Sequence, residues 1–548
     1  MKRLLLPLIA LFLGTSAWAQ ISAGGTPPSW HQATTIPTQE VTFPNQNVFA
    51  LRADAEQVYE TGGPYRVGVE VLKKLDSRTA GRWYRASNGA RFWKLTIRAQ
   101  DAQAIGVLFD QIFLPEGSEL YVYNEDHSEK LGAFTSFNNS SEEWAIAPIR
   151  GATLTIEYYA SADVKENPIL DIRGISYVFR GYKKPENRAG FGDSGPCQVN
   201  MNCAEGNQWR NEQRSVVRIL TKSGSFFGFC SGALVRTIDG SCPPYILSAD
   251  HCAMNTSTSD FNQWVFYFNY EGPNCANPAN EVGLTSESIS GCDLVASSGV
   301  GDISAGSDFL LVELANGVPT SYQPFYSGWS RESTAATNGV TIHHPSGDIK
   351  KISTYNQSLL AGSWPGTSTP NRHWQVYWTA TTNGHGTTEG GSSGSPLFNE
   401  FGEIVGVLSG GSSGCTTTSS LDYYGKFSTA WSMDGTAANQ RLSPWLDPDN
   451  TGIQTLPGTN PPCIPFSVEE WEGIEVSVYP NPTSRILYWE TPQLTQRLEV
   501  IDAMGRVVLV FEPNELKGEI NVATWAPGVY FLRMETSENL GTTRFIVP

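Results

Sequence analysis

The chain has 548 residues, with Lys+Arg 37 against Asp+Glu 54 and a formal net charge of -17. At about 100 to 200 residues per domain, this length predicts about three domains. Hydrophobic residues make up 40% and aromatic residues 11%, which excludes a disordered chain, and the acidic total without a Lys/Arg-rich block argues against nucleic acid or an anionic membrane as partner. Gly 53 and Pro 33 indicate short strands and many turns, so we expect a mostly β protein.

The N-terminus predicts export. Lys2 and Arg3 precede an apolar run at 4–13 and then Ala17-Trp18-Ala19, the order of a signal peptide, which we place at residues 1–19. The apolar run is shorter than the roughly 20 residues that span a bilayer, and no later stretch reaches that length uninterrupted. We therefore expect a mature chain from Gln20 without a transmembrane segment, in a compartment where disulfides persist.

Residues 20–188 alternate apolar and polar positions at 91–97, 119–123 and 152–158, which predicts half-buried strands and a small β-sandwich. The segment 181–190 that follows is basic, polar and glycine-bearing. Such exposed segments are sites of proteolysis, although an interdomain linker would have the same composition.

The cysteines mark out the middle of the chain. None lies before Cys197, eight lie between Cys197 and Cys415, and Cys463 stands alone. In an exported chain this predicts a disulfide-stapled module, although eight cysteines permit 105 pairings. Since no zinc-type spacing is present, we predict no metal site. Cys463 is a free thiol or pairs with an unseen partner.

Three segments of this module carry residues suited to peptide hydrolysis. A Ser/Gly-rich turn at 389–398 exposes Ser393, although most such turns are only turns. His251 follows the apolar segment 245–249 and adjoins Cys252, so it is a candidate base. Asp308 precedes an apolar strand, where its charge needs a partner such as an imidazole N–H.

The chain order His251, Asp308, Ser393 is that of chymotrypsin-type proteases, and it predicts two small antiparallel β-barrels with the site between them. Ser393 would attack the peptide carbonyl, His251 would take and return the proton, and Asp308 would hold the imidazole tautomer. The backbone N–H groups of Gly391 and Ser393 would form the oxyanion hole, worth about 3 to 4 kcal/mol per donor.

The chain from about Cys197 to Gln454 resembles the lysyl endopeptidase family of trypsin-like serine proteases. The resemblance covers Cys197 with Cys203 and the stretches 229–235, 245–252, 307–309, 342–345, 389–398, 422–426 and 441–448. It implies a protease domain at 189–457 and disulfides Cys197–Cys415, Cys203–Cys275 and Cys230–Cys252. The two remaining cysteines of the module, Cys242 and Cys292, are expected to pair with each other.

Specificity depends on where an acid lies. In trypsin-like enzymes the pocket acid lies six residues before the nucleophile, and here that position is the uncharged Thr387. The lysyl endopeptidase resemblance implies Asp422 instead, and a carboxylate at the base of a short pocket favours the compact Lys ammonium. By itself the sequence would make Asp422 a solvated turn residue, and Glu389 is an alternative acid.

Two departures from the related patterns stand out. Ser409 replaces a family histidine that stacks on a tryptophan, and Trp364 matches that tryptophan. This departure bears on the turnover, the pH profile and the strictness for Lys. Ser409, Gly410 and Gly411 should still present backbone groups to an extended peptide. His343 and His344 match a family segment outside the triad, so we interpret them as structural.

Trypsin has an Asp before the nucleophile that receives the new N-terminus, whereas this chain has Ser392. We therefore expect no activation by that ion pair. Instead, we predict that residues 20–188 are a β-rich propeptide that assists folding and blocks the site, released by a cut near Lys183, Lys184 or Arg188.

The C-terminal part begins with a turn-rich segment that we interpret as a linker at 458–470. Strand-like segments follow at 476–482, 498–508, 527–533 and 542–547, which predict a compact β-sandwich without catalytic residues. As a set they resemble the sorting domain of the type IX secretion system of Bacteroidetes, at residues 471–548. The resemblance implies passage across the outer membrane; the alternative is a carbohydrate-binding or adhesive appendage.

Together these observations predict an all-β, secreted serine endopeptidase with a chymotrypsin-like double β-barrel, cutting after Lys. It would be extracellular or attached to the outer cell surface, with protein or peptide substrates, the type IX secretion machinery as partner and no cofactor. The alternatives are Arg or broader specificity, or a catalytically weak homologue that acts as a secreted binding protein or adhesin.

Overall fold

The structure is a computed structural model that describes residues 22–60, 64–181, 194–278, 287–299, 306–367, 369–463, 476–502, 507–536 and 540–548. The signal peptide predicted at 1–19 and the cut predicted near Lys183, Lys184 or Arg188 lie outside these residues. The chain forms two compact units, Met1–Phe466 and Ser467–Pro548. Within the described ranges, no helix is long and apolar enough to cross a membrane.

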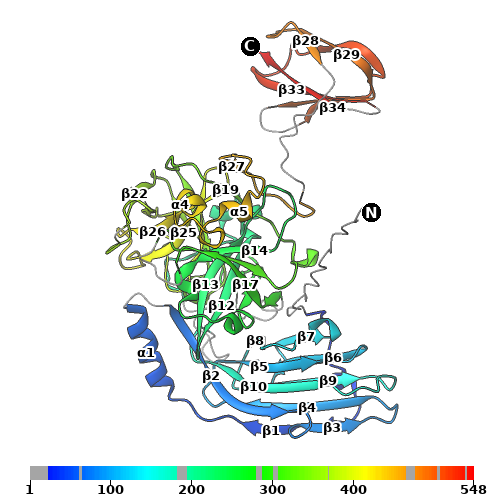
Figure 1. Cartoon of the computed structure of the whole chain (residues 1–548), viewed down its shortest axis with the longest axis vertical. Coiled ribbons are helices and arrows are strands. Elements are labelled where there is room, and N and C mark those ends of the chain that lie inside the picture. The colour runs from blue at the N-terminus through cyan, green and yellow to red at the C-terminus, as the bar shows by residue number, and fades with distance from the viewer. Residues whose placement is uncertain are drawn as a thin grey trace, which may run out of the picture. The chain divides into compact units, whose positions relative to one another are not determined.

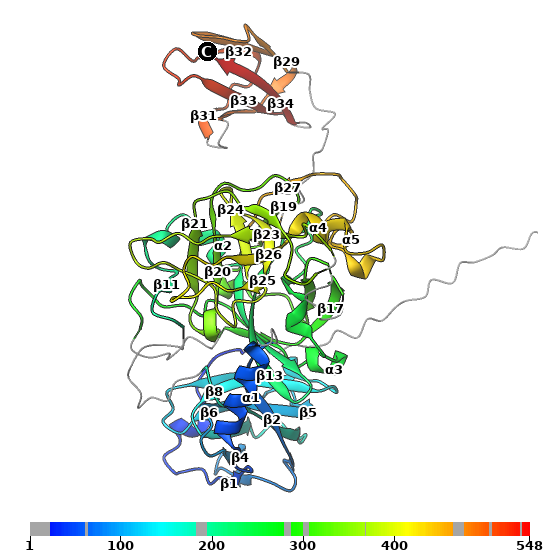
Figure 2. The ribbon, with the colours of Figure 1, turned by 90° about the vertical axis from the view of Figure 1, so that its left-hand side faces the viewer.

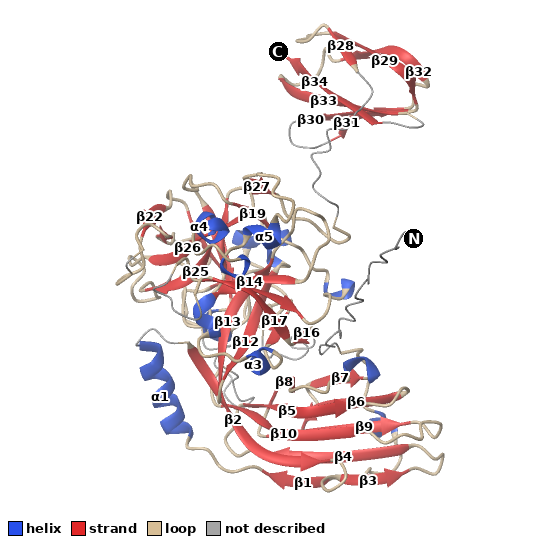
Figure 3. Ribbon diagram, in the orientation of Figure 1, coloured by secondary structure: helices blue, strands red, loops and turns tan. Residues whose placement is uncertain are grey.

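The N-terminal part of the first unit is a β-sandwich with one long helix (Figure 3). One sheet has the order β1-β4-β9-β6-β7, with β3 on β4, and the facing strands are ordered β2-β10-β5-β8. Apolar residues of both layers, such as Ile97, Ile156, Val107 and Ile175, form one core, as the alternating sequence predicts. The elements are β1 (Gln39–Thr42), α1 (Val48–Glu60), β2 (Tyr65–Asp76), β3 (Arg82–Arg85), β4 (Arg91–Arg98), β5 (Ala104–Phe113), β6 (Ser118–Asn124), β7 (Lys130–Phe134), β8 (Trp144–Arg150), β9 (Thr153–Ala160) and β10 (Ile169–Val178).

The next strands form the first barrel of the predicted protease domain. They are β12 (Val216–Ser223), β13 (Phe226–Leu234), β14 (Tyr245–Ala249), β15 (Val265–Tyr267), β16 (Ser288–Ser290), β17 (Cys292–Ser297) and β18 (Phe309–Leu314), with α2 (Arg210–Gln213) and α3 (Thr258–Phe261). They pair antiparallel in the order β16-β15-β12-β13-β14-β18-β17. Their inward residues, including Ile219, Ile246 and Phe266, are buried in one cluster.

The second barrel is a 10-stranded sheet of order β11-β21-β20-β24-β25-β26-β23-β22, with β19 on β25 and β27 on β19. Its strands are β11 (Val199–Asn200), β19 (Gly328–Ser330), β20 (Gly339–His343), β21 (Lys351–Tyr355), β22 (Leu360–Gly362), β23 (His373–Val376), β24 (Pro396–Asn399), β25 (Glu403–Gly411), β26 (Asp422–Lys426) and β27 (Thr455–Leu456). Helices α4 (Phe427–Ser432) and α5 (Ser443–Leu446) lie between β26 and β27 in the chain. A core cluster containing Leu247, Phe309, Ile342 and Val407 joins the two barrels. The all-β, chymotrypsin-like double barrel predicted from the sequence is confirmed.

The N-terminal sandwich and the first barrel share one sheet, which the sequence did not predict. Strand β2 pairs antiparallel with the start of β13, with Val69 opposite Phe226 and Tyr65 opposite Phe229. The result is an 11-stranded sheet that runs from β8 through β2 and β13 into the first barrel (Figure 1). Helix α1 lies against β2 near this junction (Figure 2).

The second unit is a small sandwich of two sheets, β28-β29-β32 and β31-β30-β33-β34. Its strands are β28 (Ser477–Tyr479), β29 (Ile486–Thr495), β30 (Arg497–Asp502), β31 (Val507–Phe511), β32 (Glu515–Asn521), β33 (Gly528–Glu535) and β34 (Leu540–Val547). Leu487, Trp489, Leu532 and Phe545 are buried in a core made only of this unit's residues. The predicted C-terminal sandwich is therefore present.

The predicted linker at 458–470 begins inside the first unit. Tyr326 and Thr459 exchange two backbone hydrogen bonds of 2.9 Å, and Cys463 is bonded to Cys242. The boundary between the units falls at Phe466 and Ser467.

Candidate active site

His251 and Asp308 meet because β14 and β18 are paired. His251 lies in the 3-10 helix η4 (Asp250–Ala253) directly after β14, and Asp308 directly precedes β18. Since Ala249 lies opposite Phe309, both residues come to the same end of the pair. Asp308 Oδ2 lies 2.8 Å from His251 Nδ1, and Asp308 Oδ1 accepts the His251 backbone N–H at 2.9 Å.

The pair is buried, with His251 4% exposed and Asp308 fully covered. Burial disfavours a charged imidazole, but the charge of Asp308 and its hydrogen bond outweigh burial, so the pKa of His251 is raised. A histidine held in this way suits a base that becomes positively charged during a reaction.

The backbone at Asp308 is in the left-handed region, with φ 56. Non-glycine residues adopt this region rarely, and such strain clusters at functional sites. Neighbouring hydrogen bonds hold this conformation. The Asp250 N–H donates to the Asp308 carbonyl at 2.9 Å, and Ser307 Oγ donates to the carboxylate of Asp434. Asp434 in turn forms an ion pair with Arg372 at 2.5 Å.

Ser393 lies in a glycine-rich turn that leads into β24. Gly391 has φ 93, and a Cβ there would lie 2.9 Å from the His344 carbonyl oxygen, so only glycine fits. Ser231 on β13 fastens the turn, because its N–H donates to the Ser393 carbonyl at 2.8 Å and its Oγ donates to the Gly391 carbonyl at 2.9 Å. These two hydrogen bonds fix the position of the turn, which belongs to the second barrel, relative to the first barrel.

Ser393 and His251 line one cleft of about 370 Å³. The other lining residues are Tyr59, Glu60, Trp364, Thr388, Glu389, Gly390, Leu408, Ser409, Gly410, Gly411 and Ser413. The structure thus brings the predicted nucleophile and base to the same cleft, with Asp308 behind the histidine.

The predicted oxyanion donors are available. In the part of the chain that the structure describes, the backbone N–H groups of Gly391 and Ser393 donate to no protein acceptor. Free backbone donors beside a nucleophile are suited to an oxyanion.

Asp422 is the first residue of β26 and is completely buried. Its Oδ2 accepts from Trp378 Nε1 at 2.7 Å, Thr388 Oγ1 at 2.7 Å and Ser413 Oγ at 2.5 Å. Burial raises the pKa of this carboxyl against the effect of these hydrogen bonds. Because Thr388 and Ser413 line the cleft, Asp422 lies directly behind the cleft wall, and the alternative of a solvated turn residue is wrong.

Glu389, the alternative acid, is already engaged. Its Oε1 lies 2.9 Å from the Gly195 N–H and 2.8 Å from Gln198 Nε2, and its Oε2 accepts from Ser346 Oγ at 3.0 Å. It therefore fastens the start of the predicted protease domain to the turn that carries Ser393.

The segment Ser409 to Gly411 ends β25 and lines the cleft. Gly410 lies opposite Tyr423 and Gly411 opposite Asp422 in the pairing with β26. The Trp364 ring covers Gly410, where a Cβ would lie 3.1 Å from the ring. All four predicted substrate-binding residues around this edge are therefore on the cleft surface.

Ser392, which directly precedes Ser393, is hydrogen-bonded to His343. His343 Nδ1 lies 2.8 Å from Ser392 Oγ, and its Nε2 lies 3.2 Å from Ser353 Oγ. Burial, with the charge of Lys351, lowers the pKa of His343 to about 3. His343 is therefore a neutral structural residue, and His344, bonded to the Asp348 carbonyl at 2.9 Å, is structural too.

The disulfides agree with the sequence except at one pair. The structure contains Cys197–Cys415, Cys203–Cys275 and Cys230–Cys252. The predicted Cys242–Cys292 pair is wrong, because Cys242 is bonded to Cys463 and Cys292 is a buried free thiol. Cys292 begins β17 and its side chain is 1% exposed in the first-barrel core, whereas Cys242 and Cys463 lie half-buried at the edge of that core.

Several residues around the cleft could not be identified from the sequence. Tyr59 and Glu60 come from α1, far from Ser393 along the chain, and His373 reaches Ser409 from β23. Ser231 could be suspected only because it follows Cys230. Among the described residues, no group of three or more His, Cys, Asp or Glu side chains could hold a metal ion.

Comparison with known proteins assigns two parts of the chain. Residues 191–425 match the family model described as lysyl endopeptidase, C-terminal domain, and residues 477–548 match the secretion system C-terminal sorting domain. A protein named lysyl endopeptidase from Pseudomonas aeruginosa is 29% identical over 381 residues, which cover 67% of this chain and 76% of that protein.

Among solved structures, the protease Anisep from Arthrobacter nicotinovorans is 17% identical with a TM-score of 0.28, over 39% of this chain and 90% of that one. A Glu endopeptidase is 20% identical with a TM-score of 0.26, over 43% of this chain and 93% of that one.

Proposed function

The chain belongs to the lysyl endopeptidase family of serine proteases, and on this premise we propose that it hydrolyses peptide bonds on the carboxyl side of lysine. The observation that carries the proposal is the cleft lined by both Ser393 and His251, with the buried carboxyl of Asp422 behind its wall.

In the proposed mechanism, Ser393 Oγ attacks the peptide carbonyl while His251 Nε2 takes its proton. His251 Nδ1 is committed to Asp308, which leaves Nε2 as the nitrogen for this transfer. The oxyanion accepts hydrogen bonds from the free backbone N–H groups of Gly391 and Ser393. His251 then returns the proton to the leaving amine, and water hydrolyses the acyl-enzyme by the same steps.

The proposed preference for lysine rests on the charge of Asp422. Within the described residues no Lys, Arg or His side chain pairs with this carboxyl. A buried carboxylate without a cation is costly, and an ammonium that enters beside Thr388 and Ser413 would supply the missing charge. An ammonium is compact and has three donors, whereas a guanidinium needs a wider planar site.

The test is digestion of one denatured protein with the secreted enzyme, followed by identification of the new termini by mass spectrometry. We expect cuts after Lys, and we expect Asp422→Asn to lower kcat/KM on a Lys peptide by about 100-fold, since a buried charge pair would be lost. Labelling of Ser393 by an organophosphonate probe checks that this variant still assembles its site.

Each other outcome has a distinct meaning. Equal cutting after Arg would replace the proposal with a broader trypsin-like specificity. Cuts spread over neutral residues would remove the role of Asp422. No cutting beyond that of Ser393→Ala, together with no probe labelling, would leave a secreted binding protein or adhesin.

We further propose that residues 20–188 are a propeptide that blocks the cleft. In support, Tyr59 and Glu60 line the cleft beside Ser393, and the Tyr59 ring lies against Gly390. Burial and the charge of Glu389 raise the pKa of Tyr59, so its hydroxyl stays neutral. N-terminal sequencing of active secreted enzyme tests this: we expect a terminus after about residue 188, and a terminus near Gln20 would contradict it.

Residues 477–548 are a secretion-system sorting domain, so the protein is secreted or attached to the cell surface. The domain implies the type IX secretion machinery as partner. We propose that it serves export alone and takes no part in hydrolysis.

A further inference from the structure

A buried histidine contacts Ser409, the residue that replaces the histidine of the related pattern at the peptide-binding edge. His373 begins β23 and is 1% exposed. Its Nε2 lies 3.1 Å from the Oγ of Ser409, the residue that stands where the related pattern has a histidine. The side chain itself does not line the cleft, whereas Ser409 does.

His373 also adjoins the second side chain of this edge. Its ring centroid lies 6.2 Å from that of Trp364, which lines the cleft and covers Gly410. In the sheet, His373 lies opposite Gly425, whose backbone is packed against the Ser307 carbonyl directly before Asp308. His373 therefore lies between the peptide-binding edge and the acid of the proposed triad.

The ring is neutral. Burial lowers the pKa of His373 to about 4; the charges of Lys426 and Arg372 act in the same direction, and the charge of Asp308 acts against them. A neutral imidazole has one N–H and one acceptor nitrogen. In the described part of the chain Nδ1 is buried without a partner, and burying an unpaired N–H is rarer than burying an unpaired acceptor. The proton therefore belongs on Nε2, where it is donated to Ser409 Oγ.

We propose that His373 is a positioning residue that, by donating to Ser409 Oγ, turns the Ser409 hydroxyl hydrogen toward the cleft and holds the edge Ser409–Gly411 for an extended peptide. A serine oxygen that accepts one hydrogen bond has its own O–H left to donate. Ser409 is only 3% exposed, but it is one of the residues that line the cleft. This inference rests on the proposed function, because it assigns a contribution to the binding of that enzyme's peptide substrates.

The test compares three variants of the secreted enzyme on Lys peptides that extend several residues before the cut. His373→Phe keeps a ring of similar size without a donor, His373→Gln restores an N–H near the position of Nε2, and Ser409→Ala removes the acceptor. We expect His373→Phe to raise KM by about 3- to 10-fold, the effect of one hydrogen bond, with a smaller change in kcat. His373→Gln should recover part of this loss.

A double variant and a pH series separate positioning from a merely structural role. If Ser409 acts through His373, the double variant His373→Phe/Ser409→Ala should have the KM of the worse single variant rather than the product of both effects. Since His373 is neutral above about pH 4, the KM profiles of wild type and His373→Gln should be parallel from pH 5 to 9. His385→Phe, at a half-buried histidine outside the cleft lining, is the control for loss of a histidine.

An unchanged KM in His373→Phe, or independent effects in the double variant, would overturn the inference. So would a loss of thermal stability in His373→Phe with normal kinetics of the folded fraction. These outcomes differ from failure of the proposed function, in which the wild-type enzyme itself does not cut after Lys.

Discussion

The two accessory regions are attached to the protease in different ways. The N-terminal sandwich shares an 11-stranded sheet with the first barrel, and Phe227 and Phe229 of β13 are buried in the same core cluster as its own apolar residues. The C-terminal domain is a separate unit with a core made only of its own residues. A region that completes a sheet can assist folding and block a site, whereas a region with its own core can be removed without altering the enzyme.

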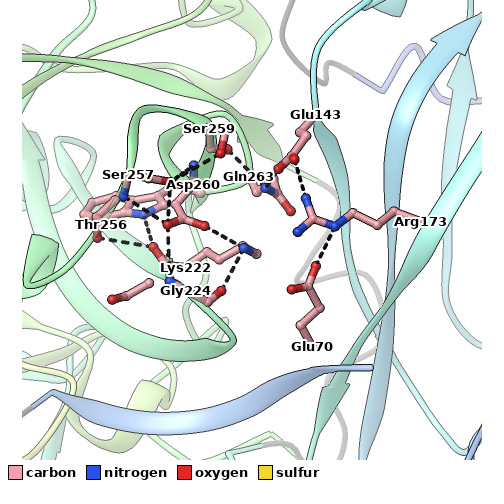
Figure 4. A network of polar contacts seen from close by, with 12 residues as sticks. Glu70, Glu143, Arg173, Lys222, Gly224, Thr256, Ser257, Ser259, Asp260 and Gln263 are labelled. Carbon is pink, nitrogen blue, oxygen red and sulfur yellow. Dashed lines mark hydrogen bonds and ion pairs between the residues drawn. The ribbon is translucent and has the colours of Figure 1, made fainter. Parts of the chain in front are cut away.

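Polar contacts reinforce the N-terminal junction (Figure 4). Arg173 of the sandwich pairs with Glu70 at 3.1 Å and with Glu143, and Gln263 of the first barrel donates to Glu143 at 2.7 Å. Lys222 and Asp260 of the barrel, 2.6 Å apart, lie close to this group. Glu70, Lys222 and Asp260 are nearly fully buried, and a buried charge that lost its partner would be costly.

Deleting each region in turn should give the largest contrast. Without residues 20–188, the β13 edge and two phenylalanines, worth about 2 kcal/mol each when buried, lose their cover, so we expect the refolded yield of active enzyme to fall by at least about tenfold. Without residues 471–548, the refolded activity should change by less than about twofold while export is lost. Active-site titration after refolding measures both.

Adding the separate N-terminal segment during refolding is the control for the first deletion. Recovery of active enzyme supports a role in folding. Equal yields with and without residues 20–188 would show that the shared sheet does not assist folding.

The block of the cleft should depend on one side chain. In a chain whose cut is prevented by replacing Lys183, Lys184 and Arg188 with Gln, we expect Tyr59→Ala to raise hydrolysis of a small Lys ester by about tenfold or less, since it removes one partly exposed ring, 38% exposed, from the cleft. Tyr59→Phe, which keeps the ring, is the matched control. Equal hydrolysis by the uncut wild type and Tyr59→Ala would mean that other contacts block the cleft.

The smallest effect should be a pH dependence of the docked N-terminal region. Burial, with the charges of Glu143 and Asp260, raises the pKa of Glu70 above its ordinary 4.5 against the opposing charges of Lys222 and Arg173. The docked form therefore binds this proton more tightly than the free form. Protonated Glu70 therefore makes the free energy of docking more favourable at and below its ordinary pKa. This contribution is lost as the pH rises through the raised pKa of the docked form.

We therefore expect the Kd between the separated N-terminal region and the Ser393→Ala protease to increase as the pH rises above 4.5, measured by calorimetry. Asp260 does not offset this effect, because Lys222 and Ser257, which lower its pKa, belong to the first barrel itself and remain in the separated protease. Glu70→Gln should flatten the profile in this window. A wild-type profile that is already flat would contradict the role of Glu70.

The sequence anticipated the parts of the molecule that local pattern controls. Alternation identified strands in both sandwiches, and the order of His251, Asp308 and Ser393 selected the double barrel. The pairing predicted for Cys242 is wrong, because counting cysteines leaves Cys292 as its apparent partner, whereas Cys463 is the real one. Cys463 belongs to the first unit rather than to a free linker, and Cys292 points into a core, facts that depend on the path of the chain in space.

What the sequence by itself determined was therefore which chemical groups are present and which strands can form, because side-chain chemistry and period-two burial are local. The tertiary structure decided which groups meet. Only the pairing of β14 with β18 brings His251 to Asp308, and only the shared sheet carries Tyr59 to the cleft. Only the sheet order, in which β23 follows β26 beyond the strand of Ser409, brings the imidazole of His373 to Ser409. Such contacts depend on packing between segments far apart in the chain, and no local pattern specifies that packing.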